Sequence, residues 1–146
     1  MEHTEKGRIL TSIILNVIRA AGQMRQDGDR MSKDLGLTNA RWDVLGSLIY
    51  FDEDDMTVAK ISARMGLTRQ AVQRVADMME KDGQVEYAEN PYHKRAKLVK
   101  PTEEGRRLFH LVMQRQIPWA NGLADGFTEE ELNSALQVLS RLTEKL

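Results

Sequence analysis

The sequence contains no cysteine, and this absence excludes several classes of protein at once. Disulfide scaffolds, thiolate metal sites, catalytic cysteines and thiol-based redox switches all need that residue. Long hydrophobic runs are also missing, since no stretch approaches the roughly 20 apolar residues that a membrane-spanning helix needs, and the amino terminus lacks a signal-peptide pattern. Nucleophile-elbow, phosphate-loop, dinucleotide-binding and metalloprotease motifs are absent too. We therefore expect a cytoplasmic protein without catalytic activity or membrane association.

The chain has almost no net charge, but its charges are unevenly distributed. Its 146 residues (16.7 kDa, 41% hydrophobic) suffice for one domain-sized core with helical extensions. The net charge is −1, so the molecule is not a general polycation. Residues 56–101 nevertheless hold nine Lys/Arg against five Asp/Glu, while the remainder has an excess of five acidic residues. A nucleic-acid surface must therefore be local, and this basic segment is where we expect it.

The amino-terminal third predicts two helices. Apolar residues recur at three- and four-residue spacing in the first of them: Ile9, Leu10, Ile13, Ile14, Val17, Ile18 and Ala21. Gly22 and the pair at 27–28 predict a bend or break before residues 31–35. Thr38 is placed to cap a second helix that carries Trp42. The acidic run at 52–55 ends this helix as a solvated loop, because it lacks the spacing of a calcium-binding loop.

The central segment predicts two short helices joined by a tight turn. Thr57 can cap a helix over residues 58–65, Gly66 can supply the positive-φ exit, and Leu67 is expected to fill the turn. Thr68 can cap the next helix, whose apolar residues alternate with outward polar ones: Arg69, Gln70, Gln73 and Arg74. This is helix-turn-helix geometry, with Arg and Gln near the amino end of the second helix, where base edges are contacted. The pattern alone fits a merely solvated surface helix equally well.

The following segment favours the DNA-binding alternative. Residues 84–89 alternate as a strand, residues 90–93 form a turn, and residues 96–100 return as a second strand with Ala96 and Leu98 on one face. Basic residues crowd the tip and the returning strand: Lys94, Arg95, Lys97 and Lys100. A hairpin with a basic tip directly after a helix-turn-helix is a wing, which can follow phosphates or enter the minor groove.

The last third predicts two more helices with apolar stripes. Thr102 can cap a long helix that Pro118 is expected to interrupt. Thr128 with Glu131 forms a capping box, Phe127 with Leu132 a hydrophobic staple, and leucines then repeat along one face: Leu132, Leu136, Leu139, Leu142 and Leu146. These helices could fold back onto the core, but the excess of apolar surface at both ends of the chain favours a partner.

Three segments resemble the MarR family of bacterial winged-helix transcriptional regulators. They are GLTNARWDVLGSL (36–48), VAKISARMGLTRQAVQRVADMMEKDG (58–83) and NPYHKRAKLVKPTEEG (90–105). The resemblance implies a two-fold homodimer that binds a pseudo-palindromic operator and is released by a small-molecule ligand. It also implies that Trp42 lies on an element lining the ligand cleft. Family members usually carry acidic residues just before the basic pair of the wing, where this chain has Tyr92 and His93.

The expected fold is mainly α with a small two-stranded β-wing, and it has three parts. Residues 1–35 form an amino-terminal dimerisation region, residues 36–101 a winged helix-turn-helix, and residues 102–146 the carboxy-terminal dimerisation helices. The expected function is that of a sequence-specific DNA-binding transcriptional regulator, a repressor, that acts as a homodimer. The alternative is a winged-helix adaptor that contacts proteins without sequence-specific DNA binding; the outward arginines and the basic wing argue against it.

The candidate residues fall into three groups. Those expected to contact double-stranded DNA are Thr68, Arg69, Gln70, Gln73, Arg74, Lys94, Arg95 and Lys97. Those expected at the dimer interface are Ile9, Ile13, Val17, Leu132, Leu136 and Leu139. Trp42 is the candidate for contact with a small-molecule effector. No catalytic residue, cofactor or metal site is expected, because the three histidines lie far apart in the sequence without carboxylates at ligand spacing.

Overall fold

The computed structural model describes residues 2–51, 53 and 55–146. The elements, in chain order, are α1 (Glu5–Ser32), the 3-10 helix η1 (Lys33–Leu35), α2 (Asn39–Ile49), β1 (Met56–Thr57), α3 (Val58–Met65), α4 (Arg69–Lys81), β2 (Val85–Ala88), β3 (Leu98–Pro101), α5 (Glu103–Ala124) and α6 (Glu129–Thr143). The chain divides into two compact units, Met1–Met113 and Gln114–Leu146. The expected class, mainly helical with a small β-wing, is confirmed.

Helix α1 is continuous over 28 residues, so the break predicted before residues 31–35 does not occur at Gly22 or at the Asp27–Gly28 pair. Thr4 caps the helix, since its hydroxyl accepts a hydrogen bond from the backbone N–H of Gly7 at 3.1 Å. Gly28 is buried, and a Cβ there would overlap the side-chain oxygen of Asn39 in α2. The glycine therefore permits close packing of α1 on α2 rather than ending the helix.

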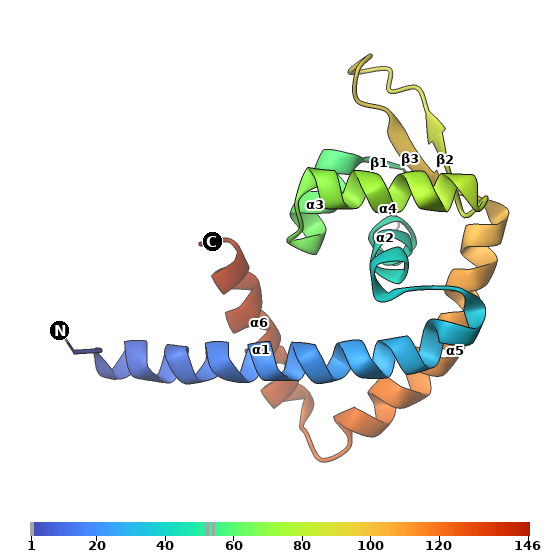
Figure 1. The fold of residues 1–146 in the computed structure, drawn as a ribbon. Coiled ribbons are helices and arrows are strands. Elements are labelled where there is room, and N and C mark those ends of the chain that lie inside the picture. Colours follow the sequence, from blue (N-terminus) through green and yellow to red (C-terminus); the bar gives the residue numbers. More distant parts are fainter. Residues whose placement is uncertain (1, 52, 54) are drawn as a thin grey trace. The chain divides into compact units, whose positions relative to one another are not determined.

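Three antiparallel strands form the sheet, in the order β1-β3-β2, instead of the two strands predicted. The additional strand β1 has only two residues and pairs with β3. On β3 the buried face is the one opposite Leu98. Tyr87 pairs with Val99, so Val99 shares the face of Val85 and Tyr87 and is fully buried, whereas Leu98 is only partly buried. Figure 1 shows the β2–β3 hairpin projecting beyond α4.

The core of the first unit lies among α2, α3, α4, the sheet and the start of α5. Its fully buried side chains come from each of these elements and are led by Val44, Leu45, Leu48, Met56, Ile61, Val72, Ala76, Met79, Val85, Val99 and Val112. Helix α2 contacts both α3 and α4, while β2 contacts α4. Helix α4 and the β2–β3 hairpin, which carry the candidate DNA contacts, are therefore held on a packed base.

The junction between the sheet and α5 depends on Gly105, which is buried. A Cβ at this position would overlap the backbone carbonyl of Gln84 and press on the Leu45 side chain at 3.2 Å. We expect Gly105→Ala to lower the free energy of unfolding by about 2 kcal/mol or more, because backbone cannot move aside as a flexible side chain can. Urea denaturation measures this loss.

Gly46→Ala is the matched control for that prediction. A Cβ at Gly46 would meet only the ring of Phe109, at an ordinary contact distance of 3.8 Å. Alanine in the middle of α2 should raise the free energy of unfolding by about 0.5–1 kcal/mol. Equal effects of the two substitutions would contradict the steric role of Gly105.

Helix α5 passes through Pro118 and ends at Ala124, so the predicted interruption at Pro118 is wrong. Thr102 caps the helix as predicted, since its hydroxyl accepts a hydrogen bond from the backbone N–H of Gly105 at 3.1 Å. The predicted capping box of α6 is also confirmed, since Thr128 and Glu131 each accept a hydrogen bond from the other's backbone N–H. Helix α6 contains no buried residue.

Candidate nucleic-acid interface

The α3–α4 pair forms as the sequence predicts, down to the residues that begin and end each helix. Thr57 and Thr68 cap the two helices, their hydroxyls accepting from the backbone N–H groups of Lys60 at 3.2 Å and Ala71 at 3.1 Å. Gly66 adopts φ 65°, a left-handed conformation that glycine enters without strain. Leu67 was expected to fill the turn, but its side chain is 40% exposed. The turn is closed by hydrogen bonds from the backbone N–H groups of Gly66 and Leu67 to the carbonyl oxygen of Ser62.

The outer face of α4 carries the predicted polar side chains. Arg69, Gln70, Gln73 and Arg74 are all exposed, while Val72, Ala76 and Met79 on the opposite face are fully buried. Within the described part of the chain, no carboxylate forms an ion pair with Arg69 or Arg74. Two guanidinium groups on one helix are thus available to an external anion.

The basic residues of α3, Lys60 and Arg64, differ from those of α4 because they form ion pairs within the protein. Glu53 pairs with Lys60 at 2.5 Å and with Arg64 at 3.0 Å, and these hydrogen bonds, with Lys60 foremost, hold the pKa of Glu53 below its ordinary value. Arg64 also lies over the ring of Phe51 and donates to the backbone oxygen of Ser47 at 3.0 Å. Glu53 is therefore an ion-pair partner and not only part of a solvated acidic run; Asp52 and Asp54 of that run lie outside the described residues.

The wing tip is ordered by local hydrogen bonds rather than by an acidic residue. Asn90 Oδ1 accepts from the backbone N–H of Tyr92 at 3.0 Å, and His93 Nδ1 accepts from the backbone N–H of Ala96 at 3.2 Å. Tyr92 is 94% exposed. Lys94, Arg95 and Lys97 are exposed, and within the described residues none of them forms an ion pair.

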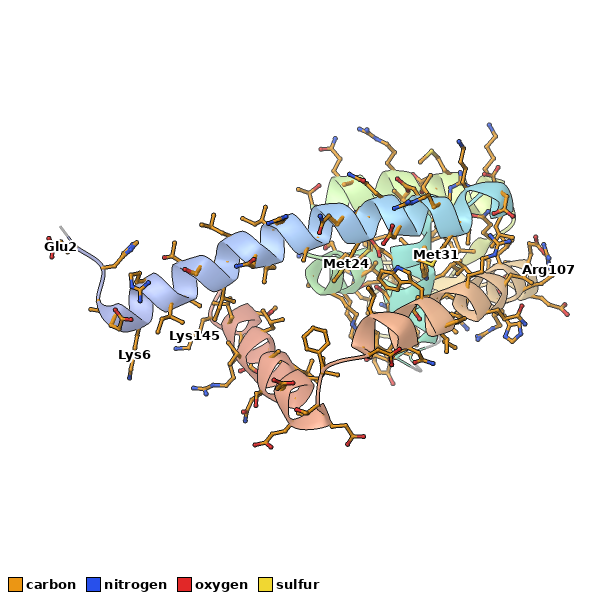
Figure 2. All side chains as sticks on the ribbon, turned by 90° about the horizontal axis from the view of Figure 1, so that it is seen from below. Glu2, Lys6, Met24, Met31, Arg107 and Lys145 are labelled. Atoms are coloured by element: carbon orange, nitrogen blue, oxygen red, sulfur yellow. The ribbon has the colours of Figure 1, made fainter. Side chains whose placement is uncertain are left out.

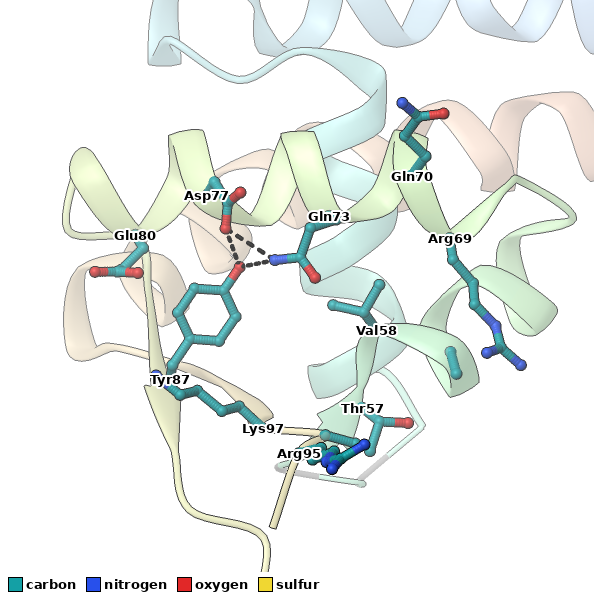
Figure 3. A pocket seen from close by; sticks show the side chains of 12 residues that line it. Thr57, Val58, Arg69, Gln70, Gln73, Asp77, Glu80, Tyr87, Arg95 and Lys97 are labelled. Atoms are coloured by element: carbon teal, nitrogen blue, oxygen red, sulfur yellow. Dashed lines mark hydrogen bonds between the residues drawn. The ribbon is translucent and has the colours of Figure 1, made fainter. Parts of the chain in front are cut away.

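A groove of about 590 Å³ separates α4 from the wing (Figure 3). Five of the eight predicted DNA-contacting residues line it: Arg69, Gln70, Gln73, Arg95 and Lys97. Thr68, Arg74 and Lys94 are not among its lining residues. The groove also contains two carboxylates, Asp77 and Glu80, which sequence analysis did not select. Its three basic and two acidic side chains make it weakly positive.

A hydrogen-bonded triad of Gln73, Asp77 and Tyr87 lies inside this groove and was not predicted from the sequence. Gln73 Nε2 donates to Asp77 Oδ1 and to the Tyr87 hydroxyl, both at 2.9 Å, and the Tyr87 hydroxyl donates to Asp77 Oδ1 at 2.6 Å. Donation from Tyr87, and then from Gln73, lowers the pKa of Asp77. Burial, followed by the contact with Asp77, raises the pKa of Tyr87. The spacing of Gln73 and Asp77 by four residues was visible in the sequence, but the arrival of Tyr87 from β2 was not.

The residues predicted for dimerisation lie on α1 and α6. Ile9 and Val17 are exposed and Ile13 is partly buried on α1, while Leu132, Leu136 and Leu139 are all exposed on α6. Only two of the 28 residues of α1 are buried, Gly28 and Ser32. In Figure 2 the side chains of α1 between Lys6 and Met24 project from a helix that extends beyond the rest of the first unit.

Trp42, the candidate effector contact, is partly buried at the α1–α2 junction. It packs against the core, and its ring lies beside Gly28. Among the described residues, no group of three His, Cys, Asp or Glu side chains has the arrangement of a metal site. None of the described helices combines the length and apolar character required to cross a membrane.

Comparisons of the sequence with known proteins find relatives along most of the chain. The model of the MarR family matches residues 35–96. An uncharacterized protein of Mycobacterium tuberculosis is 32% identical over 133 residues, which cover 91% of each chain. The transcriptional activatory protein BadR of Rhodopseudomonas palustris is 24% identical over 143 residues, which cover 97% of this chain and 82% of the relative.

Solved structures agree with this fold. A MarR-family regulator from Listeria monocytogenes in complex with a 26mer DNA superposes with a TM-score of 0.82 at 21% identity, covering 99% of this chain and 89% of that one. CouR of Rhodococcus jostii RHA1, bound to p-coumaroyl-CoA, gives a TM-score of 0.80 at 23% identity, covering 90% and 91% of the two chains. With its capped helix pair, its basic wing and these relatives, the chain belongs to the MarR family of winged-helix transcriptional regulators.

Proposed function

We propose that the protein binds an inverted-repeat operator as a homodimer and represses transcription from it. The observation that carries this proposal is an exposed Arg/Gln face on α4 next to a wing whose cations Lys94, Arg95 and Lys97 form no ion pair with any described residue. Arginine and glutamine side chains form hydrogen bonds with base edges in the major groove, and lysine and arginine contact phosphates. The Listeria monocytogenes regulator of the same fold is seen on DNA, which supports this use of the face.

A homodimer is the assembly we propose because one chain leaves too much apolar surface uncovered. Several residues of α1 are at least 40% exposed, among them Ile9, Ile14, Leu15, Val17 and Ile18, and α6 adds Leu132, Leu136 and Val138. Apolar faces of this extent normally meet a protein partner. A two-fold axis through these helices would place two copies of α4 about one helical turn of DNA apart, roughly 34 Å.

We further propose that a small-molecule effector binds near Trp42, among α1, α2 and α5, and favours a dimer shape that does not fit the operator. A ligand shifts the equilibrium between the two dimer shapes if it binds them with different affinities. CouR, of the same fold, is seen with p-coumaroyl-CoA, which supports ligand control. Repression follows if the bound dimer blocks access to the promoter. BadR is named as an activatory protein, so repression and activation by this protein have to be distinguished directly. A promoter–reporter assay with and without the protein distinguishes them.

Selection from a pool of random duplexes tests the proposed function. The purified protein is incubated with the pool, and the bound fraction is recovered and sequenced. We expect an enriched inverted repeat with half-site centres about 10 base pairs apart. Folded protein that enriches no motif in the absence of ligand would contradict sequence-specific binding and favour the adaptor alternative.

The wing should contribute mainly through phosphate contacts. Replacing Lys94 and Arg95 together by alanine is expected to flatten the dependence of log affinity on log salt concentration by about one unit for each phosphate that the wing no longer neutralises. Fluorescence anisotropy across a salt series measures this slope. The double variant Lys33→Ala/Lys145→Ala removes the same charge far from the wing in sequence and should leave the slope nearly unchanged. Equal slopes for the two double variants would remove the wing from the interface.

A further inference from the structure

The triad of Gln73, Asp77 and Tyr87 fixes how the Gln73 amide faces the groove. Gln73 and Asp77 lie one turn apart on α4, and the Tyr87 hydroxyl comes from β2 to complete a triangle with sides of 2.9, 2.9 and 2.6 Å. Figure 3 shows the amide nitrogen of Gln73 turned toward Asp77 and Tyr87, with its carbonyl oxygen turned away from both.

Only one orientation of the amide satisfies these partners. An ionised carboxylate accepts hydrogen bonds and cannot donate them. The Tyr87 proton is used on Asp77, so its oxygen is also an acceptor toward Gln73. Turning the amide over would place the carbonyl oxygen of Gln73 against two acceptors at hydrogen-bond distance. The carbonyl oxygen of Gln73 therefore remains on the side of the amide that faces away from Asp77 and Tyr87.

We propose that Asp77 is a positioning residue that makes Gln73 present a hydrogen-bond acceptor to DNA. The inference deepens the proposed function and rests on it. An acceptor pairs with the base-edge donors of the major groove, the N4 amino group of cytosine and the N6 amino group of adenine. It does not pair with O6 and N7 of guanine or with O4 of thymine, which are acceptors themselves. The usual bidentate pairing of glutamine with adenine requires the amide nitrogen to face N7, an orientation that Asp77 opposes.

The expected specificity is therefore a shared preference for cytosine and adenine over guanine and thymine at one position of each half-site. A single neutral hydrogen bond predicts about 3- to 10-fold discrimination at that position. Selection from random duplexes with the wild-type protein gives the base profile, and selection with Gln73→Ala locates the position. Gln73→Ala should flatten the profile there and leave the other positions unchanged. A profile that Gln73→Ala does not alter would overturn the inference.

Asp77→Ala tests the positioning role itself. It removes the acceptor and frees the Tyr87 proton, which can then bond the Gln73 carbonyl, so the amide can turn over. The cytosine/adenine preference should fall to less than 2-fold at the position that Gln73→Ala identifies. Glu80→Ala is the matched control, because Glu80 lies on the same helix, lines the same groove and carries the same charge. Both variants should bind DNA more tightly overall, but Glu80→Ala should keep the preference.

Exchanging the amide and the carboxylate between positions 73 and 77 should restore the base preference. In the double variant Gln73→Glu/Asp77→Asn the total charge is unchanged, the new amide can donate to the new carboxylate, and the outer carboxylate oxygen is again an acceptor. We expect the preference for cytosine and adenine to return. A flat profile for this exchange, or an Asp77→Ala profile equal to that of the wild type, would overturn the inference while leaving DNA binding intact. A wild-type protein that enriches no motif would overturn the proposed function and this inference with it.

Discussion

Replacing Arg74 by alanine is expected to weaken operator binding at least tenfold without unfolding the protein. Arg74 is exposed on α4, and the described residues offer it no ion pair, so its removal leaves the core and the local charge pairing intact. Removal of an arginine that bonds a guanine edge costs about 1–3 kcal/mol. A two-fold dimer carries this arginine twice, so the total cost is about 2–6 kcal/mol. Fluorescence anisotropy with the selected duplex measures it.

Two further variants show which group of the DNA Arg74 binds. Arg74→Lys keeps the charge but removes the planar fork, so it should restore binding if Arg74 contacts phosphate and fail to restore it if Arg74 contacts guanine. Lys81→Ala removes the same charge two turns further from the amino end of α4 and should cost less. Wild-type affinity for Arg74→Ala would show that this residue does not contact the operator.

Placing a carboxylate in the apolar stripe of α6 is expected to prevent dimerisation. Leu136 is 63% exposed in the single chain, so Leu136→Glu should not disturb the folded protomer. In a dimer that buries this residue, an unpaired charge costs about 3 kcal/mol or more, which weakens association more than 100-fold. Light scattering after size-exclusion chromatography should then show a monomer at micromolar concentration.

Gln137→Glu is the control for the dimerisation experiment. It adds the same charge at the next residue of α6, about 100° around the helix, on a side chain that is already polar. We expect Gln137→Glu to remain dimeric. If Leu136→Glu dimerises as strongly as Gln137→Glu, residue 136 lies outside the interface.

Local signals in the sequence were sufficient wherever a short segment determines its own conformation. The helix-capping threonines at 38, 57, 68, 102 and 128 all accept the hydrogen bonds expected of them. Gly66 takes the left-handed conformation that ends α3. These features depend on neighbours within a few residues, so the sequence pattern contains the whole interaction.

Other predictions were wrong because the conformation at those positions is determined by residues distant in the sequence or by the helix as a whole. Gly28 lies inside α1, where its lack of a side chain leaves room for Asn39 of α2; the turn propensity of glycine does not end the helix there. Strand β1 has only two residues and forms because β3 arrives from more than 40 residues later. Pro118 lies inside α5, and the helix continues on both sides of it.

The candidate interface shows the same division. The exposed arginines of α4 followed from helical periodicity, which places them opposite Val72 and Ala76. The role of Asp77 did not follow, because a carboxylate four residues after Gln73 gains its meaning only when Tyr87 joins from β2. The base preference that we infer therefore depends on tertiary structure, whereas DNA binding itself could be expected from the sequence.

The most direct test of the proposed homodimer on an inverted repeat is the stoichiometry of the protein on its selected duplex. Native mass spectrometry would be performed on the duplex with both half-sites and on one in which a single half-site is scrambled. We expect two protomers on the intact duplex and at least tenfold weaker binding to the scrambled one, since each mismatched base pair costs about 1–3 kcal/mol. One protomer per duplex, with an affinity that scrambling does not change, would contradict the homodimeric complex.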